Sequence, residues 1–441
     1  MQVPSALDPN AASPWPHPAR GWLVAALLAL ASIVSQFDRT VINLMIEPVK
    51  AAFALDDTGF GMLQGLAFGI FYVLACVPIG RLADRYQRRV IISVGLLFWS
   101  LFAMGSGLAR SYVQLFLTRI GVGVGEASLT PAGFSLLSDQ FPPDRLGRPM
   151  SAFLMSAPVG QGLAFAGGGS LLQWLTTSSA LKVGPLIGFA PWQAAFLAVG
   201  FPGLLLVPLF LLLREPPRRG PGGAAPLPAR EVIAIVRGRA RALVPMYASF
   251  AMVSLVSYAF FIWTPALFQR SYGWNPAQIG LSFGLILAVC GTSGVYFAGW
   301  LSDRLARRGR LDAPRIVAAF GFVGCGLFGT LAPLMPNAPL ALTLLAPAIF
   351  LSMMPYPCAG TAIQLIVPNR ARGQVSALYI TLTTLVGLGV GPLVVGLMTD
   401  FLFKNPADIR YSMAIVVGVA APLMFVLLQY ARAPYRALRA A

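Results

Sequence analysis

The chain has 441 residues, of which 57% are hydrophobic and 11% are charged, and its formal net charge is +17. A soluble domain needs about a quarter of its residues charged to cover its surface, so most of this surface faces something other than water. The positive charge does not indicate nucleic-acid binding, because the arginines lie in short clusters between apolar runs and do not gather on one soluble face. The composition indicates an integral membrane protein.

Apolar runs long enough to cross a membrane, which takes about 20 residues, recur along the whole chain. They lie near 21–46, 59–79, 90–109, 112–138, 149–174, 191–213, 243–267, 276–301, 315–335, 338–367, 375–398 and 411–431. The run at 338–367 contains Pro347, Pro355 and Pro357, which are tolerated where neighbouring helices or cavity water satisfy the freed carbonyls. The sequence therefore predicts an all-α membrane protein with twelve transmembrane helices.

A Pro/Gly-rich, basic segment divides these runs into two groups of six. The predicted organisation is a disordered N-terminal tail (1–20), a first six-helix bundle (21–213), a linker (214–242), a second six-helix bundle (243–431) and a C-terminal tail (432–441). The linker begins as a flexible connector. After Pro228 it fits a short basic amphipathic helix on the membrane surface and a solvated loop equally well.

The distribution of Lys and Arg predicts the orientation. A twelve-helix topology places most of these residues on the side that holds both tails and the linker. The other side carries Lys50, Arg110, Lys182, Arg270, Lys404 and Arg410. Cytoplasmic loops are enriched in Lys and Arg, so we expect both termini in the cytoplasm and the protein in the inner cell membrane.

The sequence shows no constellation for catalysis or for metal binding. The cysteines, Cys76, Cys290, Cys325 and Cys358, lie inside apolar runs without metal-ligand spacing, and the single histidine is His17 in the N-terminal tail. Buried small hydrophobic residues are the simplest interpretation of these cysteines. We expect no enzymatic activity, no metal and no cofactor.

One pattern occurs at the same position in each half. Residues 80–89 (GRLADRYQRR) and 299–308 (GWLSDRLARR) both read G-x-x-x-D-R-x-x-R-R. Any positively charged loop collects arginines, but that does not explain a Gly and an Asp placed twice at fixed spacing. Internal repeats are typical of transporter folds, whose substrate site lies between the repeats near mid-membrane.

Three motifs together resemble the major facilitator superfamily over nearly the whole chain. The repeated loop resembles the signature of that superfamily, with Gln87 and Ala306 in place of its second Gly. The second motif is R-x-x-x-G-x-G-E-A at 119–127, and the third is FPPDRLGR at 141–148. With the Asp38-Arg39 pair, these motifs look most like the spinster-like branch, and the anion:cation symporter branch is the alternative.

The resemblance implies alternating access, with two six-helix bundles rocking about a central cavity. We expect the protein to be a monomer. The repeated loops would then form the cytoplasmic gate, with Asp84 holding the second helix against the eleventh and Gly80 allowing close approach. The predicted gate residues are Gly80, Asp84, Arg85, Arg88, Gly299, Asp303 and Arg304.

Asp38, Arg39, Arg119 and Glu126 are charged residues inside predicted membrane helices. Such a charge costs at least about 2.5–3.5 kcal/mol at bilayer centre and usually has a function. At 1.5 Å rise per residue, Asp38 and Arg119 each lie about 12 Å below the same surface, and Glu126 lies about 10 Å deeper on the face of Arg119. We therefore expect one cavity wall to carry a cluster of carboxylates and arginines.

This cluster suits proton coupling, because a carboxylate changes its proton affinity when its arginine partner leaves. Glu126, expected to lie further from the arginines, is the first choice for the proton carrier, and Asp38 is expected to gate through Arg119. Arg39 is expected to attract an anionic headgroup or carboxylate, which a guanidinium matches with two parallel hydrogen bonds. The alternative is a static network that only sets helix packing.

Aromatic residues in the second half are candidates for the opposite cavity wall, where no ionisable residue is expected at mid-depth. They are Tyr258, Phe261, Trp263, Tyr356 and Tyr379, although membrane aromatics also serve as packing or as interface belts.

A cavity charged on one wall and apolar on the other favours a proton-coupled secondary transporter of a small-molecule or lipid anion, either a lysolipid-like amphiphile or a carboxylate. The expected partners are this substrate, protons and membrane lipids. The alternative function is a proton-driven exporter of hydrophobic drugs.

Overall fold

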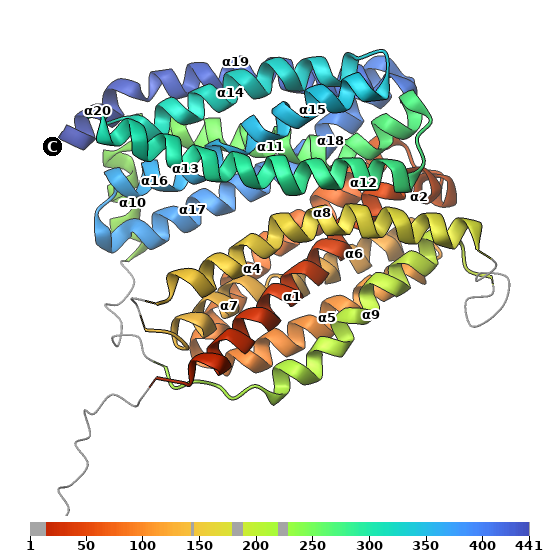
Figure 1. Cartoon of the computed structure of the whole chain (residues 1–441), viewed down its shortest axis with the longest axis horizontal. Coiled ribbons are helices and arrows are strands. Elements are labelled where there is room, and N and C mark those ends of the chain that lie inside the picture. Colours follow the sequence, from red (N-terminus) through yellow and green to blue (C-terminus); the bar gives the residue numbers. More distant parts are fainter. Residues whose placement is uncertain (1–14, 143–144, 179–187, 219–227, 441) are drawn as a thin grey trace, which may run out of the picture.

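The computed structural model describes residues 15–142, 145–178, 188–218 and 228–440, which form helices without any strand. Two helical bundles lie side by side, one built from the first half of the chain and the other from the second (Figure 1). Helix α1 begins and helix α20 ends at the same end of the molecule, which we call the terminal end; the opposite end is the far end.

Six membrane spans form the first bundle. Their elements are α1 (Pro18–Leu44); α3 (Asp57–Met62), η1 (Leu63–Ile70) and α4 (Phe71–Arg85); α5 (Arg88–Gly107); α6 (Tyr112–Glu126) and α7 (Leu129–Ser138); α8 (Gly147–Thr177); and α9 (Pro191–Leu212). The short helix α2 (Ile46–Phe53) connects the first two spans at the far end.

Six more spans form the second bundle. Their elements are α11 (Ala240–Tyr272); α12 (Pro276–Ile286), η3 (Leu287–Gly291) and α13 (Thr292–Arg307); α14 (Ala313–Leu331) and η4 (Ala332–Leu334); α15 (Ala338–Met353) and α16 (Pro355–Ile366); η5 (Asn369–Ala371), α17 (Arg372–Thr384), η6 (Leu385–Val390), α18 (Gly391–Leu397) and η7 (Met398–Phe403); and η8 (Pro406–Asp408) with α19 (Ile409–Tyr430).

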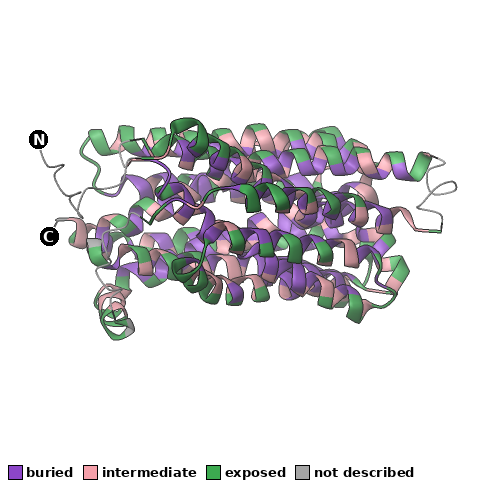
Figure 2. Cartoon of the chain, turned by 90° about the horizontal axis from the view of Figure 1, so that it is seen from below, coloured by how far each residue is buried: buried purple, intermediate pink, exposed green. Residues whose placement is uncertain are grey.

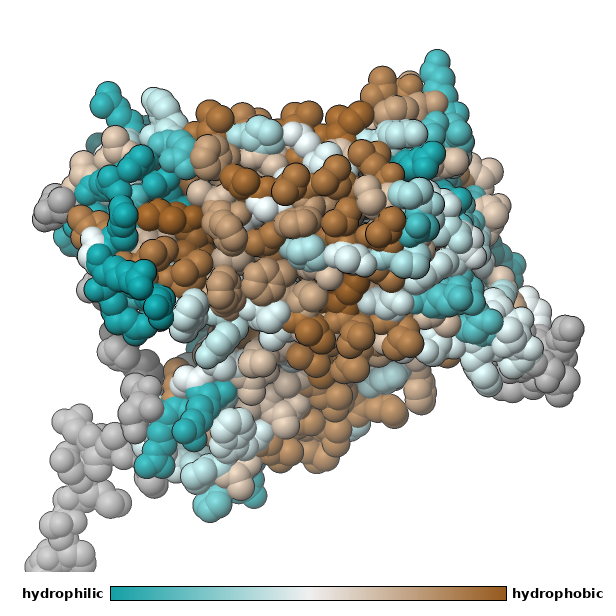
Figure 3. All heavy atoms as spheres, turned by 45° about the horizontal axis from the view of Figure 1, so that its top comes forward, coloured by the Kyte–Doolittle hydropathy of each residue, from teal (hydrophilic) through white to brown (hydrophobic). Residues whose placement is uncertain are grey.

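The described residues therefore form twelve membrane-spanning helices, as predicted. Eleven of the spans are both long and strongly apolar. The remaining one, α8, has 31 residues and is diluted by glycine, serine and glutamine, yet it packs along α1 and α12. Exposed apolar residues form a belt between two hydrophilic ends (Figure 3), while buried residues run along the inside of both bundles (Figure 2).

Three segments outside the predicted bundles are helical in the structure. Helix α1 begins at Pro18, so the last part of the predicted disordered tail is helical; residues 1–14 lie outside the described residues. After Pro228 the linker forms the short helix α10 (Ala229–Gly238), so this part of the linker is helical and not a loop. The C-terminal tail forms α20 (Arg432–Ala440), whose Tyr435 is fully buried.

An ionic contact joins the two bundles at the far end. The Arg270 guanidinium of α11 donates hydrogen bonds of 2.7 Å to Glu47 and to both carboxylate oxygens of Asp57. Lys50 also pairs with Asp57. From the second bundle, Asp400 accepts hydrogen bonds of 2.6 Å from the backbone N–H and the hydroxyl of Thr58. Charged groups of both halves thus close this end.

Glycines bring the backbones of the two bundles together below this contact. A Cβ added to Gly65 of η1 would lie 2.5 Å from the Gly389 carbonyl oxygen of η6, and one added to Gly169 of α8 would lie 2.3 Å from the Pro276 carbonyl oxygen. Small residues allow such close approach of membrane helices. The far end is therefore closed by backbone contacts that leave no room for a methyl group.

Gly65→Ala is expected to open the far end, because the added methyl group collides with backbone that has no side-chain freedom to move aside. The readout is maleimide labelling of Ala266→Cys, a fully buried position of α11, after replacement of the four native cysteines. Labelling should become several-fold faster. The matched control is Gly105→Ala, whose Cβ would make an ordinary 3.5 Å contact with Thr118. Equal labelling rates in the two variants would contradict this account.

Candidate functional site

The four membrane charges converge in the first bundle. Asp38 and Arg39 lie on α1, and Arg119 and Glu126 lie on α6. Asp38 is 0% exposed, Arg119 1% and Glu126 2%. Ionised groups buried to this degree need partners, because their desolvation costs several kcal/mol each.

Arg39 and Glu126 form an ion pair, with the Arg39 Nε donating to Glu126 Oε2. The Ser35 hydroxyl donates a second hydrogen bond of 2.9 Å to the same oxygen. The Arg39 guanidinium also lies over two aromatic rings, 4.7 Å from the ring centre of Phe68 and 4.8 Å from that of Tyr72. Cation–π contacts of this kind stabilise a desolvated cation, so Arg39 is held in a defined position.

This pairing corrects one expectation. Glu126 was expected to lie further from the arginines than Asp38 does, but it is the carboxylate that pairs with Arg39. The depth of a residue along its helix does not determine which helix faces meet. The long side chain of Arg39 also spans the depth difference of about two helical turns between Arg39 and Glu126.

Asp38 and Arg119 are buried together but are loosely paired. Arg119 donates to the backbone carbonyl of Asp38 at 3.4 Å and to the Gln64 side-chain oxygen at 3.5 Å, both at the long limit of a hydrogen bond. Neither carboxylate oxygen of Asp38 accepts a hydrogen bond of good geometry from a described residue, and the side-chain donor beside the carboxylate is the indole N–H of Trp99. Asp38 is thus the buried carboxylate without a close cationic partner.

Two cavities adjoin this cluster. A cavity of about 210 Å³ exposes Arg39 and Arg119 beside Gln64 and Phe68. A larger cavity of about 540 Å³ lies between Gln161 of the first bundle and helices of the second bundle. Gln161, Tyr258 and Phe261 line both cavities, so the two cavities are neighbours between the charged wall and the second bundle.

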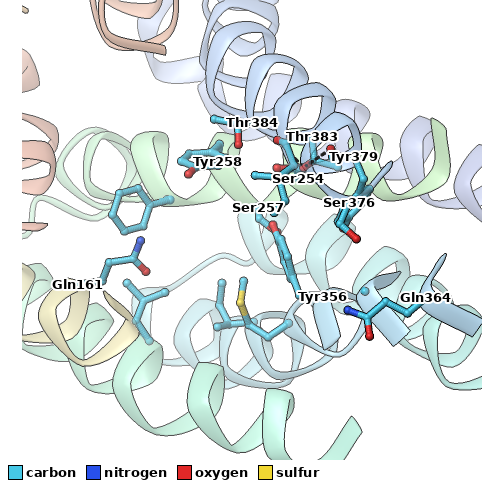
Figure 4. A pocket seen from close by; sticks show the side chains of 16 residues that line it. Gln161, Ser254, Ser257, Tyr258, Tyr356, Gln364, Ser376, Tyr379, Thr383 and Thr384 are labelled. Carbon is cyan, nitrogen blue, oxygen red and sulfur yellow. Dashed lines mark hydrogen bonds between the residues drawn. The ribbon is translucent and has the colours of Figure 1, made fainter. Parts of the chain in front are cut away.

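The larger cavity is lined by uncharged residues from several helices (Figure 4). Gln161 of α8 faces hydroxyl-bearing side chains from α11, α16 and α17. The labelled polar lining residues are Gln161, Ser254, Ser257, Tyr258, Tyr356, Gln364, Ser376, Tyr379, Thr383 and Thr384. Apolar lining comes from Phe261, Leu287, Ile349, Met353 and Ile380. This wall therefore offers neutral hydrogen-bonding groups on an apolar surface.

Of the five aromatic candidates, Tyr258, Phe261, Tyr356 and Tyr379 line this cavity. The expectation was wrong for Trp263, which is fully buried at the far-end contact, where its indole N–H donates to the Pro392 carbonyl oxygen at 2.9 Å. The serines and threonines were missed. Their signal was helical spacing, since Ser254, Ser257 and Phe261 recur on one face of α11.

The residues of the predicted gate are separated at the terminal end. Asp84, Arg85, Asp303 and Arg304 are exposed. A Cβ added to Gly80 would reach only Pro131 of its own bundle at 3.9 Å, and one added to Gly299 would meet no atom within 4 Å. The two bundles therefore make no close contact through these glycines in this conformation.

Arg88 does not belong with the exposed gate residues. It is 1% exposed and forms ion pairs with Asp139 of its own bundle and, at 2.7 Å, with Glu215 at the start of the linker. Three hydrogen bonds from Arg218 to backbone carbonyls at 83, 84 and 86 hold the linker against the signature loop. Arg88 is thus an internal anchor for the linker.

A twelve-helix fold in two halves, with a buried charge cluster beside a central cavity, is typical of a membrane transporter. The sequence profile of the Major Facilitator Superfamily matches residues 28–392. The chain belongs to this superfamily, whose members are transporters and not enzymes.

Comparison with individual proteins places the chain in the spinster-like branch. It is 30% identical over 410 residues to human protein spinster homolog 1, covering 88% of this chain and 75% of the human protein. It is also 28% identical over 411 residues to an MFS-type efflux pump of Mycolicibacterium smegmatis, covering 92% and 90% of the two chains.

Solved structures agree with this placement. The fold is similar to the crystal structure of a bacterial homolog of the human lysosomal transporter spinster, described as inward-facing and unoccupied. The TM-score is 0.78 at 25% identity, covering 96% of this chain and 98% of the homolog.

Proposed function

We propose that this transporter moves an amphipathic or organic anion, such as a lysolipid or a carboxylate, in a proton-coupled alternating-access cycle. The observation that carries the proposal is Arg39, an ion-paired guanidinium whose side chain remains 22% exposed at the cavity wall. The Arg39 guanidinium can exchange Glu126 for an anionic substrate while it stays over the rings of Phe68 and Tyr72.

Coupling follows from competition for Arg39. When a substrate anion binds the guanidinium, Glu126 loses its ionic partner in a nearly dry site. A buried carboxylate without a partner is stabilised by taking up a proton. Asp38, which has no ion-pair partner among the described residues in this conformation, is the second carboxylate that we propose as a proton carrier. Anion binding and protonation of the cluster are thereby linked.

The conformation supports the proposed direction of opening. The far end is closed by ion pairs and glycine contacts, while the repeated loops are apart at the terminal end. Most of the arginines outside the spans lie at the terminal end, which the positive-inside rule assigns to the cytoplasm. We therefore propose an inner-membrane protein with both termini in the cytoplasm, facing inward in this structure as the similar bacterial structure does.

Asp84→Asn is expected to shift the population further toward the conformation open at the terminal end. Asp84 contributes to holding the second span against the eleventh when this end closes, and the amide cannot form the same ionic contact. Cysteine labelling of Ser376→Cys, which lines the larger cavity, should increase from the terminal-end side. Unchanged labelling would count against a gate role for Asp84.

A hydrophobic-drug exporter is the second candidate, favoured by the similarity to the mycobacterial efflux pump and by the apolar part of the larger cavity. Proteoliposomes with an imposed pH difference distinguish the two functions. An anion transporter accumulates lysophosphatidylglycerol but not neutral monoacylglycerol, and a protonophore abolishes the accumulation. If the pH difference drives transport of a neutral hydrophobic dye but of neither lipid, the exporter is favoured.

A further inference from the structure

A separate cavity of about 890 Å³ lies at the terminal end of the first bundle, between the start of α1 and the connection from α7 to α8. It shares no lining residue with the two central cavities. Its lining consists of Trp15, Pro16, Pro18, Trp22, Gln140, Phe141, Pro142, Arg145, Gly147 and Arg148. The transport role proposed for the charge cluster therefore makes no use of this cavity.

Phe141 gives this cavity a fixed wall. Its ring packs against the first turn of α1 so closely that a Cβ added to Gly21 would lie 2.6 Å from it. The same ring makes an edge-on contact with Trp22, with ring centres 5.9 Å apart. The start of α1 and the segment at 140–142 are thus packed into one unit.

Gln140 is the unusual residue of this wall. It is 1% exposed, and neither its amide nitrogen nor its amide oxygen has a hydrogen-bond partner among the described residues. Buried amides are nearly always hydrogen-bonded, and an unpaired one costs about 1–3 kcal/mol. An amide in this state beside a cavity points to a polar ligand.

The cavity combines positive charge with aromatic surface. Arg145 and Arg148 are both exposed at its rim. Trp22 is 46% exposed on the second turn of a membrane span, and its neighbour Leu23 is also exposed. Indole side chains at the ends of spans lie at the depth of lipid headgroups. A ligand here meets guanidinium groups on one side and a lipid-facing indole on the other.

We propose that this cavity binds the headgroup of an anionic phospholipid from the surrounding leaflet. Arg148 pairs with the phosphate, the Gln140 amide donates to a phosphate or ester oxygen, and Trp22 packs along the glycerol and upper acyl chain. Guanidinium groups match phosphate oxygens in geometry and charge. The aromatic, membrane-facing wall favours a lipid over free phosphate, which has no apolar part to place there.

The test is lipid binding to the purified full-length protein in detergent. Phosphatidylglycerol, phosphatidylcholine and inorganic phosphate are titrated separately, with bound lipid counted by native mass spectrometry and stability followed as Tm. Phosphatidylglycerol should bind and raise Tm, with little response to the other two. Arg148→Ala should weaken phosphatidylglycerol binding about tenfold, the effect of losing one charge-assisted hydrogen bond.

The matched control is Arg310→Ala, which removes an exposed arginine in the connection between α13 and α14. It should bind phosphatidylglycerol as the unmodified protein does. Equal weakening in both variants would show that net charge alone attracts the lipid and would overturn the site.

Gln140→Met separates a ligand-binding role from a structural one. Because the amide is unpaired without ligand, an apolar side chain of similar length should maintain or raise Tm in lipid-free detergent. The same variant should lose most of the Tm increase caused by phosphatidylglycerol. A fall in lipid-free Tm with an unchanged lipid response would contradict the proposal, as would a Tm increase of equal size from inorganic phosphate.

Discussion

Asp38→Asn is expected to abolish substrate accumulation driven by a pH difference while leaving downhill exchange largely intact. The Asp38 carboxylate is fully buried and forms no ion pair with a described residue. A charged carboxylate in that position is costly, so its neutral form fits this conformation. Asparagine reproduces the neutral form but cannot release a proton, which removes the coupling step and preserves the shape of the site.

The measurement compares two modes in the same proteoliposomes: uptake driven by an imposed pH difference, and exchange with unlabelled substrate at equal pH. Gradient-driven accumulation by Asp38→Asn, at a level matched for reconstituted protein, would exclude Asp38 as a proton carrier.

Glu126→Gln tests the other buried carboxylate of the cluster in the same assays. It should also lose accumulation, but it should bind the anion more tightly than the unmodified protein, because Arg39 no longer has a charged competitor. Tighter binding in Glu126→Gln and unchanged binding in Asp38→Asn would distinguish the two carboxylates. Identical binding in both variants would argue against competition between Glu126 and the substrate.

Arg39→Lys is expected to impair transport of an anionic substrate at least about tenfold, since a charge-assisted hydrogen bond contributes about 1.5–3 kcal/mol. Lysine keeps the charge but loses the planar two-point contact and the stacking on Phe68 and Tyr72. Arg119→Lys should also impair transport, but Arg119 contacts the Asp38 backbone as well. Arg39 is therefore the cleaner test.

The experiment sets an anionic lipid beside its uncharged analogue, with Arg39→Lys and the unmodified protein matched for expression. Both proteins should insert and fold, as judged by monodisperse elution. Equal transport of the two lipids by the unmodified protein, or full activity of Arg39→Lys, would contradict the proposed anion transport. The hydrophobic-drug exporter would then be the favoured function.

The sequence predicted the spans because a membrane helix needs a long apolar run, and this requirement acts on every helix separately. It also brought Asp38, Arg39, Arg119 and Glu126 into one region, because depth follows from the fixed rise per residue. It did not predict their pairing, since depth does not determine which helix faces meet or how far an arginine side chain extends.

Trp263 shows the same limit. An aromatic side chain suits both cavity lining and helix packing, so residue type alone could not separate the cavity lining from the far-end contact. The polar lining of the larger cavity was accessible in principle, because its hydroxyl groups recur at helical spacing. Arg88 was misassigned because its partner Glu215 lies in the linker, far away in sequence.

Spans 2, 8 and 11 contain π-helical turns near their middles, at η1, η3 and η6. A π turn holds an extra residue, and such turns often mark functional sites. If a π turn becomes an α turn, the helix beyond it rotates about its axis by about 100°, which is the rotation per residue of an α-helix. In span 2 that rotation would turn α4 and its signature loop while α3 stayed packed on α18. The two halves of this span, α3 and α4, can therefore rotate relative to each other about the π-helical segment η1.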